Sequence, residues 1–136
     1  MINSKTPYLR FHHIGVATKR IAQEMTEYAL LGYATEGDFF EDPLQGIRGI
    51  FLTSESGPRL ELLENLPGSQ TLNVWLDRGQ KFYHMAYYTD SIEQAIQYFR
   101  EHCGILTISP KPSVYFENEI CFMMLRNRQV IELLQT

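Results

Sequence analysis

The strongest constraint on the fold is a self-match within the sequence at an offset of 71 residues. This offset carries His13 onto His84 and Glu61 onto Glu132. It also pairs similar residues at other positions: Thr18 with Thr89, Ile21 with Ile92, Met25 with Ile96, Tyr28 with Phe99, Phe51 with Phe122, Leu62 with Leu133 and Leu63 with Leu134. A self-match at one fixed offset across this much of a chain predicts two copies of one structural unit.

Each copy is expected to contain a strand, a helix and three further strands. In the first copy the strands are expected at residues 9–17, 33–39, 47–53 and 59–63, with a helix between Thr18, its cap, and Gly32, its end. In the second copy the strands are expected at residues 81–89, 106–109, 120–125 and 129–134, with a helix between Asp90, its cap, and Gly104, its end. Polar or proline-containing loops are expected at residues 41–46 and 110–113.

This order of elements predicts an α+β fold built from two βαβββ modules. One such module cannot bury a sheet face alone, so the two should pair into a curved mixed sheet around a cavity, with the helices outside. We expect one domain, residues 1–136, made of module 9–64 and module 81–136 joined by linker 65–80.

Composition narrows the function classes. The 136 residues include 44% hydrophobic and 21% charged residues, which is typical of one globular domain. The net charge is −4 and no run of Lys and Arg is present, which argues against a nucleic-acid partner. The sequence shows no secretory h-region and no apolar run of about 20 residues, so we expect a cytoplasmic protein without a membrane partner. Cys103 and Cys121 are expected to be buried, reduced thiols.

The paired His and Glu residues are the candidate metal ligands. Glu61 and Glu132 lie within apolar strand sequences, where a carboxylate is costly unless it is paired or bound to a cation. Each follows its matched histidine, His13 or His84, by 48 residues. Mixed nitrogen and oxygen ligands suit one divalent first-row ion, namely Zn, Co, Ni, Mn or Fe. The alternative interpretation is two solvent-facing Glu and two hydrogen-bonded core His. His12 is expected to point to the opposite face of its strand from His13.

Nearly the whole chain resembles the vicinal oxygen chelate superfamily, and most closely its methylmalonyl-CoA epimerase and glyoxalase I branches. The similar segments are, in order, HHIGVAT, DPLQG, RLELLE, GQKFYHMAYYT, SIEQAI, PKPS and VIELLQ. The resemblance places the family's metal ligands at His13, Glu61, His84 and Glu132. It also implies a small-molecule substrate such as an acyl thioester, and it leaves open whether the cavity lies within one chain or between the chains of a homodimer.

The function that the resemblance implies is a metal-dependent epimerase or isomerase of the methylmalonyl-CoA epimerase type. Such an enzyme abstracts a proton alpha to a carbonyl through a metal-stabilised enediolate, and Glu132 and Glu41 are the candidate catalytic acid–base pair. Glu61 favours a second function, a glyoxalase I-like lyase, because the epimerases tend to carry Gln at that ligand position. An Fe²⁺ oxygenase and a non-catalytic drug-binding resistance protein of the same fold are two further possible functions.

Overall fold

A computed structural model describes residues 6–136 of the chain, and within them it contains eight strands and three helices. The strands are β1 (Leu9–Ala17), β2 (Ala34–Asp42), β3 (Ile47–Thr53), β4 (Leu60–Asn65), β5 (Phe82–Thr89), β6 (Ile105–Pro112), β7 (Glu119–Met124) and β8 (Val130–Gln135). The helices are α1 (Ile21–Ala29), α2 (Asn73–Asp77) and α3 (Ile92–Glu101). No helix in this part of the chain combines the length and the hydropathy that a membrane crossing requires.

The strands form one mixed, open sheet in the order β2-β3-β4-β1-β5-β8-β7-β6, which confirms the predicted α+β fold with a mixed sheet. The pairs β1–β4 and β5–β8 are parallel, whereas β2–β3, β3–β4, β6–β7 and β7–β8 are antiparallel. The predicted βαβββ order occurs twice, with α2 between the copies. By packing, residues 13–83 form one compact unit, and residues 84–136 together with residues 6–12 form the other. The single-domain prediction and its module bounds remain predictions.

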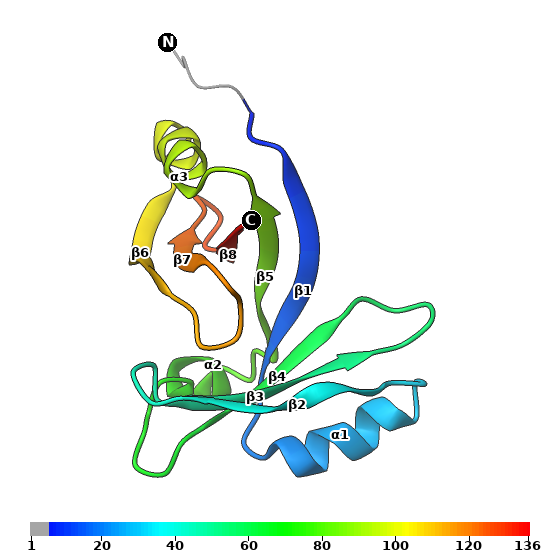
Figure 1. Ribbon diagram of the computed structural model, residues 1–136. Coiled ribbons are helices and arrows are strands. Elements are labelled where there is room, and N and C mark those ends of the chain that lie inside the picture. The colour runs from blue at the N-terminus through cyan, green and yellow to red at the C-terminus, as the bar shows by residue number, and fades with distance from the viewer. Residues whose placement is uncertain (1–5) are drawn as a thin grey trace. The chain divides into compact units, whose positions relative to one another are not determined.

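In the unit of residues 13–83, helix α1 lies along one face of the strands β2, β3 and β4 (Figure 1). The buried side chains on this face come from β1, α1, β3 and β4: Val16, Ile21, Ile50, Leu52, Leu60 and Leu62. A second buried cluster contains Ala17, Ile47, Leu63, Leu72 and Tyr83. Trp75 of α2 packs against this second cluster and stacks on Tyr83, with the ring centroids 5.3 Å apart. Trp75 therefore anchors α2 against this cluster.

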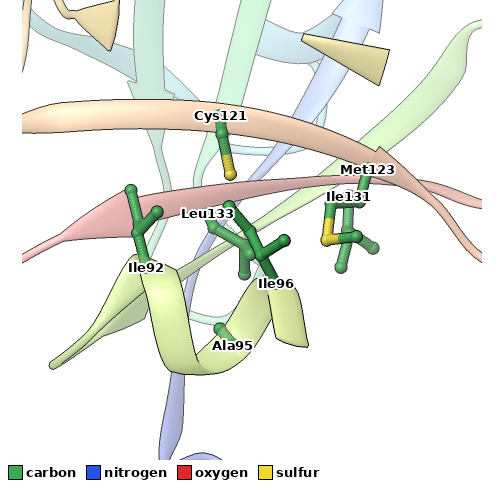
Figure 2. Close-up of a cluster of buried hydrophobic side chains, with 7 residues drawn as sticks. All are labelled: Ile92, Ala95, Ile96, Cys121, Met123, Ile131 and Leu133. Atoms are coloured by element: carbon green, nitrogen blue, oxygen red, sulfur yellow. The ribbon is translucent and has the colours of Figure 1, made fainter. Parts of the chain in front are cut away.

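In the other unit, helix α3 covers β7 and β8, as Figure 2 shows. The buried cluster between them consists of Ile92, Ala95, Ile96, Cys121, Met123, Ile131 and Leu133. Burial raises the pKa of the Cys121 thiol from its ordinary 9.0 to about 12, and the negative charge of Glu132 adds to the shift. Cys121 therefore behaves as a small, neutral core residue, as expected. Cys103 is exposed, so the prediction that both thiols are buried was wrong for this one.

The helix starts differ from the predicted caps. Thr18 does not cap α1, because its hydroxyl donates to the carbonyl of Leu63 at 2.8 Å. Asp90 does not cap α3, because the N-cap residue is Ser91, whose hydroxyl accepts the Gln94 N–H at 3.2 Å. The chain turns into each helix one or two residues later than the sequence pattern indicated. The side chains of Thr18 and Asp90 instead stabilise the strand end and the turn that precede each helix.

Two predicted loops are partly strand. Glu41 and Asp42 belong to β2, so the turn before β3 is shorter than the predicted loop at 41–46. Residues 110–112 belong to β6 despite two prolines. Strand β6 lies at an edge of the sheet, where proline's missing N–H leaves no ladder bond unmade, and its pairing with β7 is irregular. Proline therefore marked an edge strand here and not a loop.

Candidate functional site

In the unit of residues 13–83, a histidine and a glutamate meet in the interior. His13 lies on β1 and Glu61 on β4, and the parallel register of these strands places Gly15 beside Glu61. The Nε2 atom of His13 is 3.2 Å from Oε1 of Glu61. The histidine is 0% exposed and the glutamate 7% exposed. The carboxylate is thus removed from water and directed at an imidazole nitrogen.

The other unit contains the same arrangement. His84 lies on β5 and Glu132 on β8, and the parallel register places Ala86 beside Glu132. The Nε2 atom of His84 is 3.3 Å from Oε1 of Glu132. These residues are 1% and 4% exposed. Gly15 and Ala86 stand at matched positions of the repeat, so the two strand registers are the same, residue for residue.

A phenylalanine ring packs beside each histidine. Phe51 of β3 pairs in register with Glu61, and its ring lies edge-on to His13 with the centroids 5.0 Å apart. Phe122 of β7 pairs in register with Glu132, and its ring lies edge-on to His84 at 5.4 Å. The repeat therefore reproduces three residues on three strands. The sequence offset already matched the two phenylalanines, but it did not reveal that they support the histidines.

The chemistry of each pair fits a metal ion. With metal–ligand bonds of about 2.0–2.2 Å, two adjacent ligand atoms of one ion are about 2.8–3.6 Å apart, from octahedral to tetrahedral angles. The N–O separations of 3.2 and 3.3 Å fall in this range. A buried carboxylate facing an imidazole requires a positive charge, either a proton on the ring or a cation. All four residues are buried and are of the types that hold first-row metals.

Glu41 lies elsewhere in the unit of residues 13–83. It is an exposed residue of β2, and in register it pairs with Arg48 of β3. Its neighbour Phe40 stacks on Phe51 with the centroids 6.0 Å apart. Because neighbouring side chains of a strand point to opposite faces, Glu41 lies on the face of β2 opposite to Phe40. The structure thus places the predicted base on the other face of the strand from the ring that reaches the His13 environment.

His12 has an aromatic environment. Its ring lies edge-on to Tyr88 and to Phe116, with centroids 5.2 and 5.3 Å away. Tyr88 and Phe116 also contact one another at 6.1 Å. His12 therefore belongs to an aromatic cluster with residues of β5 and of the segment before β7. In the sequence, nothing but its position next to His13 drew attention to His12, and the aromatic cluster could not be predicted.

Comparisons with known proteins agree with this picture. A family profile described as the glyoxalase/bleomycin resistance protein/dioxygenase superfamily matches residues 12–122. The chain belongs to that superfamily. The matched residues include His13, Glu61 and His84, and end before Glu132. The predicted resemblance to the vicinal oxygen chelate proteins is thereby confirmed. A search of curated proteins found no match.

Solved structures of the same superfamily fold are similar over nearly the full length. One is a hypothetical protein of Bacillus halodurans C-125, with TM-score 0.79, 25% identity, and 94% of each chain covered. Another is the methylmalonyl-CoA epimerase of Mycobacterium tuberculosis, with TM-score 0.78, 18% identity, and 96% of this chain and 91% of that chain covered. A third is a methylmalonyl-CoA epimerase solved with methylmalonyl-CoA and NH4+, with TM-score 0.75, 22% identity, and 94% of each chain covered. At these identities, the epimerase structures establish the fold.

Proposed function

We propose that His13, Glu61, His84 and Glu132 together bind one divalent first-row metal ion, and that the chain is an epimerase or isomerase acting alpha to a carbonyl. The observation that carries the proposal is the matched, buried His–Glu pair in each module. One such pair is explained by an internal ion pair. Two pairs with the same register and the same spacing are the donor set that a six-coordinate ion with open positions requires.

The substrate class proposed is an acyl thioester. Support comes from the similar structures, which include several methylmalonyl-CoA epimerases, one of them in complex with methylmalonyl-CoA. A thioester carbonyl and a neighbouring carboxylate or oxygen supply two acceptor atoms for one site. When bound, a divalent ion supplies Lewis acidity, which lowers the energy of negative charge on such oxygens.

The chain's own residues then perform the remaining tasks. The two imidazoles fix the position of the site, and the rings of Phe51 and Phe122 hold them by edge contacts and exclude water. A carboxylate accepts the alpha proton, and an acid returns a proton to the carbon. Glu132 is the first candidate for one role because it is buried and lies beside His84.

Glu41 is the second candidate of the proposed acid–base pair. Its side chain is exposed on β2, so it takes part only if it turns toward the substrate when the substrate binds. A substitution separates the two candidates, because only one of them is a proposed metal ligand.

A glyoxalase-type lyase is the second candidate function. Glu61 favours it, because this residue supplies a carboxylate where the epimerases tend to carry an amide, and a second buried carboxylate offers a second base. Its substrate is the thiol adduct of a 2-oxoaldehyde. A non-catalytic binding protein of this fold does not need buried His–Glu pairs, which counts against a purely binding role.

The experiment follows the alpha proton by NMR in D₂O. Metal-loaded protein is incubated with a chiral 2-methylmalonyl-type thioester and, separately, with a 2-oxoaldehyde thiol adduct. Metal-dependent deuterium wash-in with loss of stereochemical purity is expected for the epimerase. Rearrangement to a 2-hydroxy thioester identifies the lyase instead, and the absence of both reactions contradicts the proposed chemistry.

Variants of the two carboxylates assign the base. Glu41→Gln should retain the metal yet lose about 100-fold or more in rate if Glu41 moves the proton, the usual scale for a general base. An unchanged rate in this variant excludes Glu41 and leaves Glu132 or Glu61. Glu55→Gln, a change of an exposed loop carboxylate, is the matched control and should leave both metal content and rate unchanged.

A further inference from the structure

A pocket lies in the unit of residues 13–83, between the segment 17–24 and residues 76–81. Three cationic side chains line it, Lys19, Arg20 and Lys81, together with the amides of Gln23 and Gln80. The sequence carries a net charge of −4, so three cations around one pocket are a local reversal of the overall charge. None of these residues belongs to the proposed metal site.

Two of the three cations lack a compensating charge. Lys81 forms an ion pair with Glu24, the one acidic residue that lines the pocket. The side chains of Lys19 and Arg20 form no hydrogen bond or ion pair within residues 6–136, and both residues are exposed. Like charges around one pocket repel one another, and an anion bound between them offsets the repulsion. The pocket is therefore electrostatically prepared for a ligand of negative charge.

The fold itself does not require these charges. At the matched positions of the repeat, Lys19 corresponds to Asp90 and Arg20 to Ser91. Asp90 forms an ion pair with Arg10 at 3.5 Å, and Ser91 caps α3. The second module thus uses the same turn for stability, whereas the first module uses it to expose two cations. This difference points to a ligand and not to a structural need.

We propose that this pocket binds a phosphate group of an anionic ligand. Arg20 offers the planar fork that binds phosphate oxygens in pairs, and Lys19 and Lys81 offer point charges. The amides of Gln23 and Gln80 add neutral donors. Several donors on two separate chain segments suit a tetrahedral, doubly charged phosphate better than a planar, singly charged carboxylate. The ligand is a phosphorylated small molecule, and the phosphate comes from a thioester carrier or from a free nucleotide.

The location suits a long ligand. Thr18 at the edge of the pocket follows His13 by five residues on the same chain segment, most of it in β1. Five residues of extended strand span about 17 Å. A carrier with its phosphate at one end and its acyl group at the other is long enough to span this distance. Phosphate binding itself requires neither the metal nor the proposed reaction.

The test is a titration of the ¹⁵N-labelled full-length protein, at low salt, with coenzyme A, ADP and pantetheine. Coenzyme A and ADP carry phosphates and pantetheine has none. Amide signals of Thr18, Gln23 and Gln80 should shift with the first two ligands, and the affinity should fall as salt is raised. Lys19→Ala and Arg20→Ala should each weaken binding about 10-fold, the lower range for one charge-assisted hydrogen bond. Arg126→Ala removes one exposed positive charge elsewhere and is the control.

The outcomes separate the sources. The carrier is the ligand if coenzyme A binds much more tightly than both ADP and pantetheine, and if the double variant of Lys19 and Arg20 binds coenzyme A no more tightly than pantetheine. Equal affinities for coenzyme A and ADP that the double variant abolishes identify the nucleotide phosphates. Binding that is unchanged in the double variant, or an absence of binding at low salt, overturns the proposal. His13→Ala should retain full phosphate binding, so a failure of the metal site leaves this test intact.

Discussion

The two modules share a skeleton and differ at their helix starts. The parallel pairs β1–β4 and β5–β8 have the same register, and each holds a His and a Glu at matched positions. In both modules, the first backbone N–H of the helix also donates to a side chain of the parallel partner strand, β4 for α1 and β8 for α3. Glu64 of β4 accepts the N–H of Ile21 at 3.1 Å, and Gln135 of β8 accepts that of Ile92 at 2.8 Å. The repeat therefore extends to single hydrogen bonds.

Arg20 and Ser91 show where the modules separate. Both are N-cap residues in extended conformation, but only Ser91 gives a side-chain cap bond among the residues described. The comparison teaches that the matched residues are those that fix strand register and the His–Glu pairs. At the helix starts, the differing residues Lys19, Arg20 and Asp90 are exposed, and there each copy is able to carry a separate function. Each prediction below tests one matched pair of positions.

The largest expected effect is the loss of stability when either of the matched phenylalanines, Phe51 or Phe122, is replaced. Removing a core aromatic ring costs about 3–5 kcal/mol of unfolding free energy. Phe51 is 0% exposed and also stacks on Phe40, whereas Phe122 is 9% exposed. Phe51→Ala should therefore lose more stability than Phe122→Ala in urea unfolding. Phe→Leu at each position retains most of the volume and should lose clearly less. A larger loss at Phe122 would contradict the description of Phe51 as the more buried support.

The second prediction compares the paired metal ligands. A four-ligand zinc site contributes about 10–16 kcal/mol of binding free energy, so one ligand corresponds to about 100- to 1,000-fold in affinity. If the proposed site is symmetric, His13→Ala and His84→Ala should weaken metal binding by similar factors, measured by competition with a coloured chelator. A large loss for one histidine and none for the other would show that the modules do not share one ion. Metal-free protein after reconstitution would contradict the site altogether.

The sequence predicted the elements that local pattern determines. Strands β1 and β3 have their predicted bounds, because alternating or continuous apolar residues ended at clear turn signals. The pairing of His13 with Glu61 was predictable because the same spacing occurs twice. Phe51 and Phe122 were visible as a matched pair, but their role depends on the register between β3 and β4, which no single segment encodes.

Other features needed tertiary information. The cap of α1 lies 43 residues away along the chain, at Glu64, so a search for local capping residues selected Thr18 instead. Proline at residues 110 and 112 indicates a loop until the strand is known to lie at an edge. The basic pocket combines Lys19 and Arg20 with Lys81, which only folding brings together. Neighbouring cations in a sequence are usually a solvated surface.

The third prediction concerns the N-cap positions. Ser91→Ala should destabilise the protein by about 1 kcal/mol, because the Gln94 N–H loses its acceptor. Arg20→Ser should have the opposite sign, since it introduces a capping hydroxyl at the matched position and removes an uncompensated charge. Urea unfolding of both variants measures the two effects. If Arg20→Ser also weakens ADP binding, the residue has a ligand role that the capping serine of α3 does not have. Destabilisation by Arg20→Ser would contradict the equivalence of the two helix starts.

The smallest effect is expected just beyond the helices, where Gly32 and Cys103 occupy matched positions. Both have left-handed backbone, with φ of 91° and 70°. This conformation costs a residue with a Cβ atom about 1–2 kcal/mol, partly offset by its lower entropy in the unfolded chain. At Gly32 the cost is purely conformational, because no heavy atom of the described residues lies within 4 Å of the place that an alanine Cβ would take. Alanine should therefore be less stable than glycine by about 0.5–1 kcal/mol at both positions.

The stability difference between glycine and alanine is measured in two pairs of proteins, one for each position. The first pair is the unmodified chain and Gly32→Ala, and the second is Cys103→Gly and Cys103→Ala, which differ by one methyl group without the thiol. Midpoints of urea unfolding at constant slope give each difference. Cys103→Gly should also be at least as stable as the unmodified chain, because the exposed thiol makes no buried contact that its removal would lose. Glycine favoured in one module but not in the other would mean that the two helix ends differ in the unfolded or the folded chain, and that the repeat does not extend beyond the helices.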